Sequence, residues 1–278
     1  MRRSRLALGA AVAVLAAAAA TAPGAQAIVG GRPDGDDHPA AGMMAIEHNG
    51  ITEAWCSAWY AGPHRSDPGT GVVVTAGHCL ADLAELGFAP SDITVTFDTG
   101  AHFYWDEAER VTPAVGATTW HPAYAYDYAL SDDEDYGVVL LEDPVPGLAP
   151  MKLPAAGMLD DLKNRGALAG SLWDSVGYGF TATFKRGPVR YDPPPGRMLA
   201  LSRFAGLTKS ELGLLGNPDA GFSTGCYGDS GGPVLPHGSN VVAGMTAGGD
   251  PLCRAKATPT RLDIPVARAF FRDHLRLP

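Results

Sequence analysis

The chain has 278 residues, of which 46% are hydrophobic and 18% are charged, and its formal net charge is −9. This length is ample for a sizeable core in one or two domains, and the acidic balance argues against nucleic acid and anionic membrane surfaces as partners. The 35 glycines and 23 prolines favour a turn-rich β protein over a helical bundle.

Residues 1–27 have the pattern of a signal peptide and are left out of the fold. A basic start at 2–5 is followed by the apolar run 6–20 and by a small-x-small cleavage pattern at 25–27. The apolar run is short for a membrane span, and no other long apolar run follows. We therefore expect a secreted protein, exported by the Sec or the twin-arginine route, and no membrane association.

The first half of the mature chain predicts short strands at 43–46 and 55–60, with a Gly/Pro-rich loop after them. The β-branched run 72–74 predicts a buried strand that leads into the sequence Thr-Ala-Gly-His-Cys at 75–79. A histidine pKa near 6.5 suits proton transfer at neutral pH. His78 is therefore a candidate general base.

A general-base histidine needs a carboxylate that orients it and stabilises the imidazolium. Asp135 opens the apolar run 136–141, as expected for an aspartate at the start of a buried strand. Asp127 also precedes a short apolar stretch, but that stretch runs at once into the acidic residues 132–134. We favour Asp135 and keep Asp127 as the alternative, and we expect 132–134 to be a solvated acidic turn.

The second half contains fewer regular signals. Residues 144–159 lack strand periodicity and are expected to form a linker, and the basic, proline-rich stretch 181–197 is expected to be an exposed loop. Residues 204–222 show little beyond a possible helical turn. Apolar residues at helical spacing in 266–277 predict a C-terminal helix.

The most informative stretch is Gly-Cys-Tyr-Gly-Asp-Ser-Gly-Gly-Pro-Val at 225–234. A serine hydroxyl becomes an effective nucleophile when a base takes its proton and fixed donors receive the oxyanion. Glycines suit the second task, because the backbone can turn sharply and bring amides close to a substrate. Together with 75–79 and Ile-Val-Gly-Gly at 28–31, this stretch resembles the trypsin/chymotrypsin family of serine proteases, here as a secreted, bacterial-type member.

The resemblance covers nearly all of 28–278 and implies an all-β fold of two antiparallel six-stranded-type β-barrels with a C-terminal helix. It places barrel 1 at about 28–147, barrel 2 at about 160–264 and the helix at about 265–277, with the site in the cleft between the barrels. Four cysteines in a secreted chain suggest two disulfides, with three pairings open from the sequence alone. The resemblance selects the pairs Cys56–Cys79 and Cys226–Cys253.

The resemblance also implies roles for single residues. Ser230 would be the nucleophile of a triad with His78 and Asp135, and the amides of Gly228 and Ser230 would form the oxyanion hole. The amine of Ile28 would pair with the carboxylate of Asp229. Because Ile28 follows the cleavage pattern directly, we expect signal peptidase to release this terminus with no zymogen stage.

Three further residues are implied for the specificity pocket, namely Thr224 at its base and Ala247 and Gly249 on the strand that binds substrate. A neutral threonine leaves a buried substrate cation without a partner, which is costly. We therefore expect an uncharged residue, aromatic or aliphatic, at the P1 position of the substrate. The family usually has Ser-Trp-Gly where this chain has Ala247, Gly248 and Gly249, so the missing tryptophan removes one wall of the next subsite.

We expect a serine endopeptidase that hydrolyses polypeptides through an acyl-enzyme, as a monomer, with protein inhibitors as possible further partners. No cofactor is expected, and the sequence has no His/Cys/carboxylate cluster with zinc spacing. Two alternatives stay open. One is a binding protein that keeps a protease fold without turnover, and the other is an esterase that uses the same triad.

Overall fold

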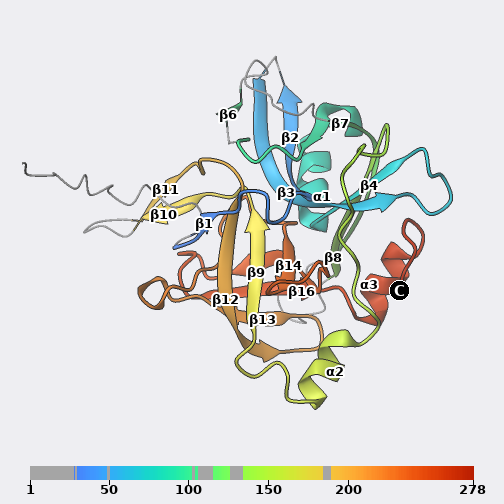
Figure 1. Ribbon diagram of the computed structural model, residues 1–278. Coiled ribbons are helices and arrows are strands. Elements are labelled where there is room, and N and C mark those ends of the chain that lie inside the picture. Colours follow the sequence, from blue (N-terminus) through green and yellow to red (C-terminus); the bar gives the residue numbers. More distant parts are fainter. Residues whose placement is uncertain are drawn as a thin grey trace, which may run out of the picture.

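The computed structural model describes residues 28, 30–48, 51–101, 104–105, 115–125, 134–183 and 189–278. Strands dominate, and they form two antiparallel sheets that each close on themselves as a six-stranded ring with one additional edge strand. In Figure 1 the first barrel, coloured blue to green, lies above the second, coloured yellow to red. The fold predicted from the sequence, two antiparallel β-barrels with a C-terminal helix, is confirmed. No helix in this part of the chain is both long and apolar enough to cross a bilayer.

The first barrel has the strand order β2-β5-β7-β8-β4-β3, and pairing of β3 with β2 closes the ring. The short strand β6 is added at one edge of β3. The strands are β2 (Ala41–His48), β3 (Ile51–Pro63), β4 (Gly71–Thr75), β5 (Ile93–Thr96), β6 (Tyr104–Trp105), β7 (Val115–Ala125) and β8 (Glu134–Leu141).

Buried β-branched residues explain the centre of this barrel. All five residues of β4 are buried, and β-branched side chains such as Val72–Val74 pack well on a pleated sheet. β4 pairs with β8, and Thr75 at its end lies opposite Gly137. Because the chain after β4 carries His78 and β8 begins next to Asp135, this pairing brings both residues to the same edge of the barrel.

The second barrel has the strand order β12-β13-β16-β15-β14-β9, and pairing of β9 with β12 closes the ring. The first strand of the chain, β1, pairs with β12 and so joins this second sheet. The strands are β1 (Arg32–Pro33), β9 (Leu172–Gly177), β12 (Met198–Leu207), β13 (Leu212–Leu215), β14 (Pro233–Pro236), β15 (Gly244–Gly249) and β16 (Lys256–Arg261).

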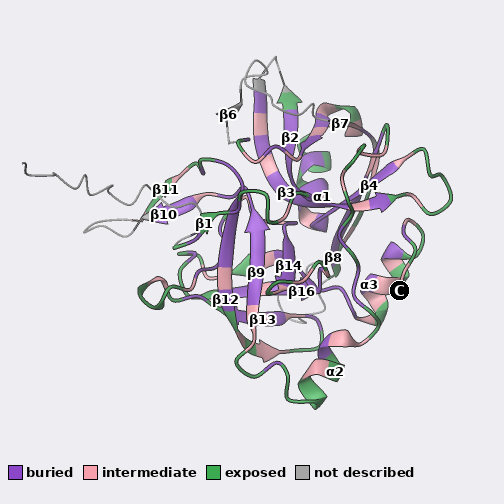
Figure 2. Ribbon diagram, in the orientation of Figure 1, coloured by how far each residue is buried: buried purple, intermediate pink, exposed green. Residues whose placement is uncertain are grey.

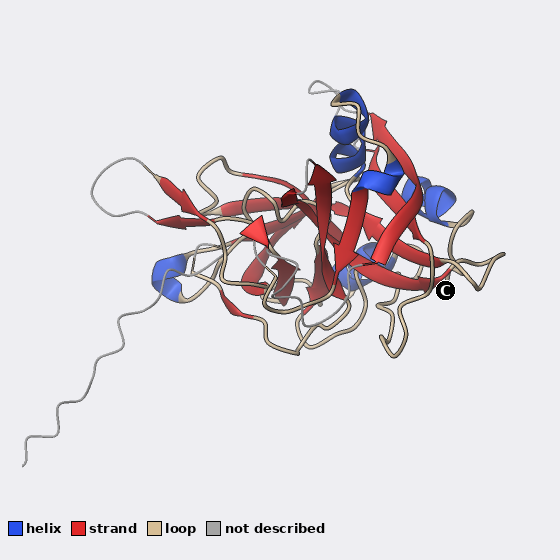
Figure 3. Cartoon of the chain, turned by 90° about the horizontal axis from the view of Figure 1, so that it is seen from above, coloured by secondary structure: helices blue, strands red, loops and turns tan. Residues whose placement is uncertain are grey.

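The helices are short and lie between or outside the strands (Figure 3). They are α1 (Gly77–Glu85), α2 (Met158–Asn164) and α3 (Pro265–Phe271), with the 3-10 turns η1 (Pro90–Asp92) and η3 (Pro218–Ala220). The C-terminal helix is shorter than the expected 265–277. After it the chain continues as a turn, in which the Phe271 carbonyl accepts hydrogen bonds from the amides of both His274 and Leu275.

The stretch 181–197 is not the exposed loop that the sequence predicts. Its ends form the hairpin of β10 (Thr181–Thr183) and β11 (Arg190–Asp192), and Arg197 is buried. The Arg197 guanidinium bonds the Asp34 carboxylate at 2.8 Å and the carbonyls of Ala41 and Phe97 at 3.1 Å. A buried charge needs such partners, and here they link the second barrel to the first.

A single hydrophobic core runs through the contact between the barrels. It combines residues of the first barrel, such as Val74 and Val138, with Val176 and Leu199 of the second and Phe271 of α3. The strands are accordingly mostly buried, while the connecting loops are exposed (Figure 2). This shared core fixes the two barrels against each other, and with them the residues at their junction.

Candidate active site

His78 is the second residue of α1 and lies three residues after Thr75, the end of β4. The disulfide between Cys56 and Cys79 joins this turn to β3. The indole nitrogen of Trp55 donates to the Cys79 carbonyl at 2.9 Å, a contact that sequence reasoning missed. The backbone on which the His78 ring stands is therefore held by one covalent link and one hydrogen bond.

Asp135 accepts two hydrogen bonds from His78. One carboxylate oxygen accepts from the His78 amide at 2.8 Å, and the other lies 2.8 Å from ring atom Nδ1. Both side chains are largely shielded, with exposed fractions of 23% for His78 and 10% for Asp135. The alternative, Asp127, lies outside the described residues.

The environment of His78 raises its pKa. Burial alone would lower it, but the hydrogen bond and negative charge of Asp135, helped by the more distant Asp82, outweigh burial. An imidazole held in this way through Nδ1 presents Nε2 as the atom that can accept a proton. The geometry fits a general base whose protonated form is stabilised by a neighbouring carboxylate.

Ser230 lies on the loop before β14, at the junction with the first barrel. Its carbonyl accepts from the Ser57 amide at 2.9 Å. The Cys79 sulfur lies 3.7 Å from His78 Nε2 and 4.0 Å from the Ser230 carbonyl oxygen, so the ring and the serine backbone flank the same atom. The described hydrogen bonds include none between the Ser230 hydroxyl and the His78 ring, a bond that often tightens only when substrate binds.

Glycine is required next to Ser230 by close contact and by conformation. Gly231 has a φ of +83°, and a Cβ there would collide with the Thr75 hydroxyl and the Ser57 carbonyl. Gly228 has a φ of +89°. In the part of the chain that the structure describes, the amides of Asp229 and Gly231 donate to backbone carbonyls, whereas those of Gly228 and Ser230 donate to none. These two amides are therefore available to an external acceptor.

Asp229 is fully enclosed beneath this loop. Its carboxylate accepts from the amide of Cys226 at 2.7 Å and from that of Gly179 at 2.8 Å. Burial raises the pKa of Asp229 to about 6, although these two amides oppose the rise. No described cation forms an ion pair with it, and an unpaired buried carboxylate is costly.

Ile28, the expected partner of Asp229, is fully buried, and its side chain packs with Met198 and Ala200. Its nitrogen belongs to the peptide bond with Ala27, so it is an amide and carries no charge. The expected signal peptide, 1–27, lies outside the described residues.

A small pocket of about 160 Å³ opens beside Ser230. Ala247 and Gly249 line it, whereas Thr224 is fully buried and does not line it; the Thr224 hydroxyl donates to the Cys253 carbonyl at 3.1 Å. The volume is below the roughly 300 Å³ of common ligand sites, so the pocket suits one side chain. The full lining is Gly225, Cys226, Tyr227, Ser230, Thr246, Ala247, Gly248, Gly249, Asp250, Pro251, Cys253 and Ala257.

Asp250 is a pocket residue that sequence reasoning missed. Its carboxylate accepts hydrogen bonds from four backbone amides, at 2.7 Å for Ala255, 2.8 Å for Lys256, and 3.1 Å for both Leu252 and Arg254. Burial raises the pKa of Asp250, but these amides outweigh burial and lower it overall. The carboxylate thus organises the loop that carries Cys253, which the second disulfide joins to Cys226.

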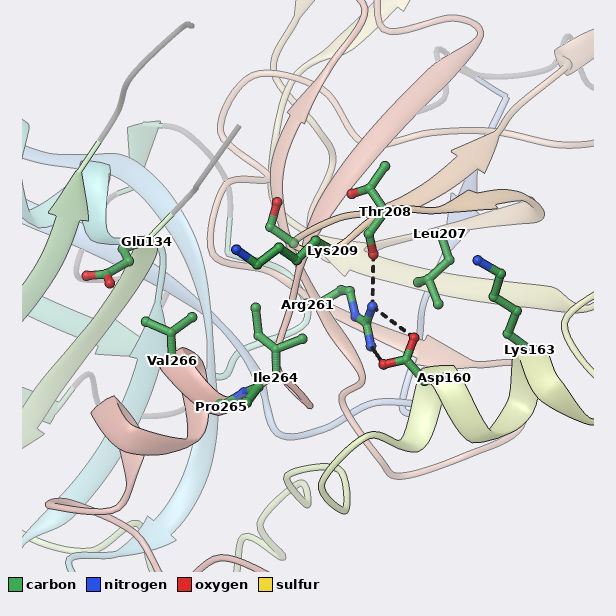
Figure 4. A pocket seen from close by; sticks show the side chains of 11 residues that line it. Glu134, Asp160, Lys163, Leu207, Thr208, Lys209, Arg261, Ile264, Pro265 and Val266 are labelled. Carbon is green, nitrogen blue, oxygen red and sulfur yellow. Dashed lines mark hydrogen bonds and ion pairs between the residues drawn. The ribbon is translucent and has the colours of Figure 1, made fainter. Parts of the chain in front are cut away.

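A larger hollow of about 890 Å³ lies elsewhere, between α2, α3 and the β12–β13 turn (Figure 4). Its buried Arg261 bonds Asp160 at 2.7 Å, Asp263 at 2.9 Å and the Thr208 carbonyl at 2.8 Å, so its charge is already satisfied. None of the predicted site residues lines this hollow. We therefore assign the candidate chemistry to the smaller pocket, where Ser230 lies.

Comparison with known proteins agrees with this geometry. No curated protein sequence matches the chain. The family model described as Trypsin, in contrast, matches residues 28–270, a range that includes all the candidate site residues. The chain therefore belongs to the trypsin family of serine proteases.

Proposed function

We propose that this protein is a secreted serine endopeptidase with the catalytic triad His78, Asp135 and Ser230. The observation that carries the proposal is the double hydrogen bond by which Asp135 holds the amide and the ring of His78. A carboxylate in this position fixes the tautomer of the histidine and stabilises the imidazolium that forms during catalysis. The family to which the chain belongs supports the reaction class.

In the proposed reaction, Ser230 Oγ attacks the scissile carbonyl while His78 Nε2 takes its proton. The same proton then passes to the leaving amine, and an acyl-enzyme remains on Ser230. Water, deprotonated by His78, hydrolyses the ester and restores the serine. Every step uses groups of this chain, the substrate and water.

The oxyanion of the tetrahedral intermediate would be received by the amides of Gly228 and Ser230. The assignment is supported because neither amide donates to a backbone carbonyl among the described residues. Donors that are already oriented stabilise the developing charge without reorganisation, and one such donor contributes on the order of 3 kcal/mol to lowering the barrier.

The P1 residue of the substrate would be uncharged and of modest size. Thr224 offers no charge, and its hydroxyl is already bonded to Cys253. The carboxylate of Asp250 is engaged by the amides of its own loop, so it is not available to a substrate lysine or arginine. Thr224 therefore gives a cation no charged partner at the expected base of the pocket, and pairing with Asp250 would require displacing its amide donors, which disfavours lysine and arginine at P1.

Release of Ile28 by signal peptidase would complete the site. The new α-ammonium would pair with Asp229, whose carboxylate is buried and has no ion-pair partner among the described residues. N-terminal sequencing of the secreted protein tests this step, and a start at any residue other than Ile28 would defeat it.

The experiment that tests the proposed function is a cleavage profile of the secreted protein on a peptide library, analysed by mass spectrometry. We expect cleavage after small uncharged residues and none by the Ser230→Ala variant. Hydrolysis of a nitrophenyl ester without peptide cleavage would favour the esterase, and no turnover of either substrate would favour a binding protein. Cleavage after lysine or arginine would refute the assignment of the pocket.

A further inference from the structure

Three histidines from distant parts of the chain lie together beside the C-terminus. His64 follows β3, His121 lies in β7, and His274 lies in the turn after α3. The ring centroid of His274 is 4.6 Å from that of His121 and 5.7 Å from that of His64. Rings that share one tetrahedral zinc ion, with bonds of about 2 Å, have centroids about 5 Å apart. The observed separations lie on either side of this value.

The nitrogens of two of these rings are in states that suit a metal ligand. His274 Nδ1 is buried and has no hydrogen-bond partner in the described part of the chain. His64 Nδ1 lies 3.2 Å from the Ser66 hydroxyl, which leaves Nε2 for another partner. A hydrogen bond to one ring nitrogen commonly orients the other nitrogen toward a metal.

Backbone contacts hold the three segments in place. The Arg65 amide donates to the His274 carbonyl at 2.8 Å, and the Arg65 guanidinium donates to the Arg272 carbonyl. His121 is fixed by its pairing with Val138 of β8. The backbone that carries each ring is therefore held in place by these contacts.

Some rotation is needed. Among the described residues, a set of three possible metal-donor atoms within 4.8 Å of one another is found at Cys56, His78 and Cys79, and not at the three histidines. The two cysteines of that group form a disulfide, so it offers no thiolate. His121 is exposed, and exposed side chains change rotamer on the picosecond-to-nanosecond timescale. Its ring can therefore turn toward His274 without any change of the fold.

We propose that His64, His121 and His274 form a binding site for a divalent first-row transition metal ion, with Zn²⁺ as the first candidate. Neutral imidazole is a favoured ligand of this ion, and three protein ligands leave the fourth position to water. The ligands come from the β3–β4 loop, from β7 and from the C-terminal turn. The bound ion thus ties the end of the chain to the first barrel and stabilises the folded state.

The test uses the secreted protein carrying His78→Ala, which removes the catalytic imidazole as a competing ligand. The protein is stripped with a chelator and titrated with Zn²⁺ by calorimetry, and retained zinc is measured after gel filtration. We expect one zinc ion per chain. In this background, His64→Ala and His121→Ala each weaken binding by about tenfold or more.

His237→Ala serves as the matched control, because His237 is also exposed but is bonded to Asp174 at 2.9 Å on another face. We expect this variant to bind zinc as tightly as its parent. Zinc should raise the Tm of the parent and of the control but not that of His121→Ala. A parent that retains no zinc, or His64→Ala and His121→Ala variants that bind it as tightly as the parent, would overturn the proposal.

Discussion

The two halves of the candidate site are held in different ways. In the first barrel, direct hydrogen bonds join Asp135 to His78. In the second barrel, the loop of Ser230 rests on Asp229, which receives two backbone amides but no ion pair from the described residues. The first half is therefore complete once the barrel has folded, whereas in our proposal the second half is completed by the cation that cleavage before Ile28 would supply. Control of activity would thus act on the nucleophile loop.

We expect the largest effect on activity from a substitution in the first barrel, where Asp135 is already bonded to His78. Asp135→Asn keeps the shape of the side chain but removes the charge that fixes the tautomer of His78, so kcat should fall on the order of ten-thousandfold. Steady-state kinetics on a peptide substrate measures this loss. Asp143→Asn, an exposed position just after β8, is the matched control and should keep full activity.

Substitution of Asp229 tests the second barrel. Its effect on the free energy of unfolding should be opposite in chains that keep residues before Ile28 and in chains that begin at Ile28. A carboxyl group whose pKa is raised on folding destabilises the folded state once pH exceeds its unfolded value, and the penalty is complete above its folded pKa of about 6. In a chain that keeps residues before Ile28, Asp229→Asn should therefore remove this penalty, which is about 3 kcal/mol at pH 7 because one pKa unit corresponds to about 1.4 kcal/mol, and stability should no longer fall between pH 5 and pH 7.

In the secreted chain that begins at Ile28, the same substitution should lower stability and activity, because it leaves the ammonium buried without its partner. Urea unfolding of both chain forms at pH 5 and pH 7 measures the two effects. Equal changes in the two forms would break the proposed link between Asp229 and the terminus.

Substitution of Asp250 tests whether its loop in the second barrel shapes the pocket beside Ser230. Asp250→Ala removes the acceptor of four amides and loosens the loop that carries Cys253, so KM for the preferred peptide should rise by about tenfold, the worth of one charge-assisted hydrogen bond. Asp250→Asn keeps one carbonyl oxygen and should give an intermediate KM. A change in kcat alone would show that this loop does not shape the pocket.

The smallest expected effect is a shift in the pH dependence of kcat/KM, which we attribute to His78 in the first barrel. Catalysis needs neutral His78, and the raised pKa of this ring places the acid limb of kcat/KM above the ordinary histidine value. The charge of Asp82 contributes to that rise. Asp82→Asn should therefore move the acid limb slightly toward lower pH, whereas Asp161→Asn, on α2 of the other barrel, should leave it in place. An unmoved limb in both variants would argue against His78 as the titrating group.

The fold and the proposed roles of His78 and Ser230 could be predicted because each residue lies in a contiguous motif. Asp135 could be selected because an apolar strand follows it. Arg197 misled the sequence analysis, since its partners Asp34, Ala41 and Phe97 are distant in the chain. Sequence analysis likewise missed the hydrogen bonds from loop amides to Asp250 and the cluster of His64, His121 and His274. These contacts form only when segments distant in the chain pack together. The spacing of residues along the sequence does not predict such contacts.

The central claim is that Ser230 is a nucleophile activated by His78. Labelling of the secreted protein with a fluorophosphonate probe, followed by peptide mapping, tests it most directly. The account predicts one phosphonylated residue, Ser230, with labelling nearly abolished in His78→Ala and retained in His237→Ala. A protein with a free Ile28 terminus in which Ser230 stays unlabelled, or is labelled equally fast without His78, would contradict it.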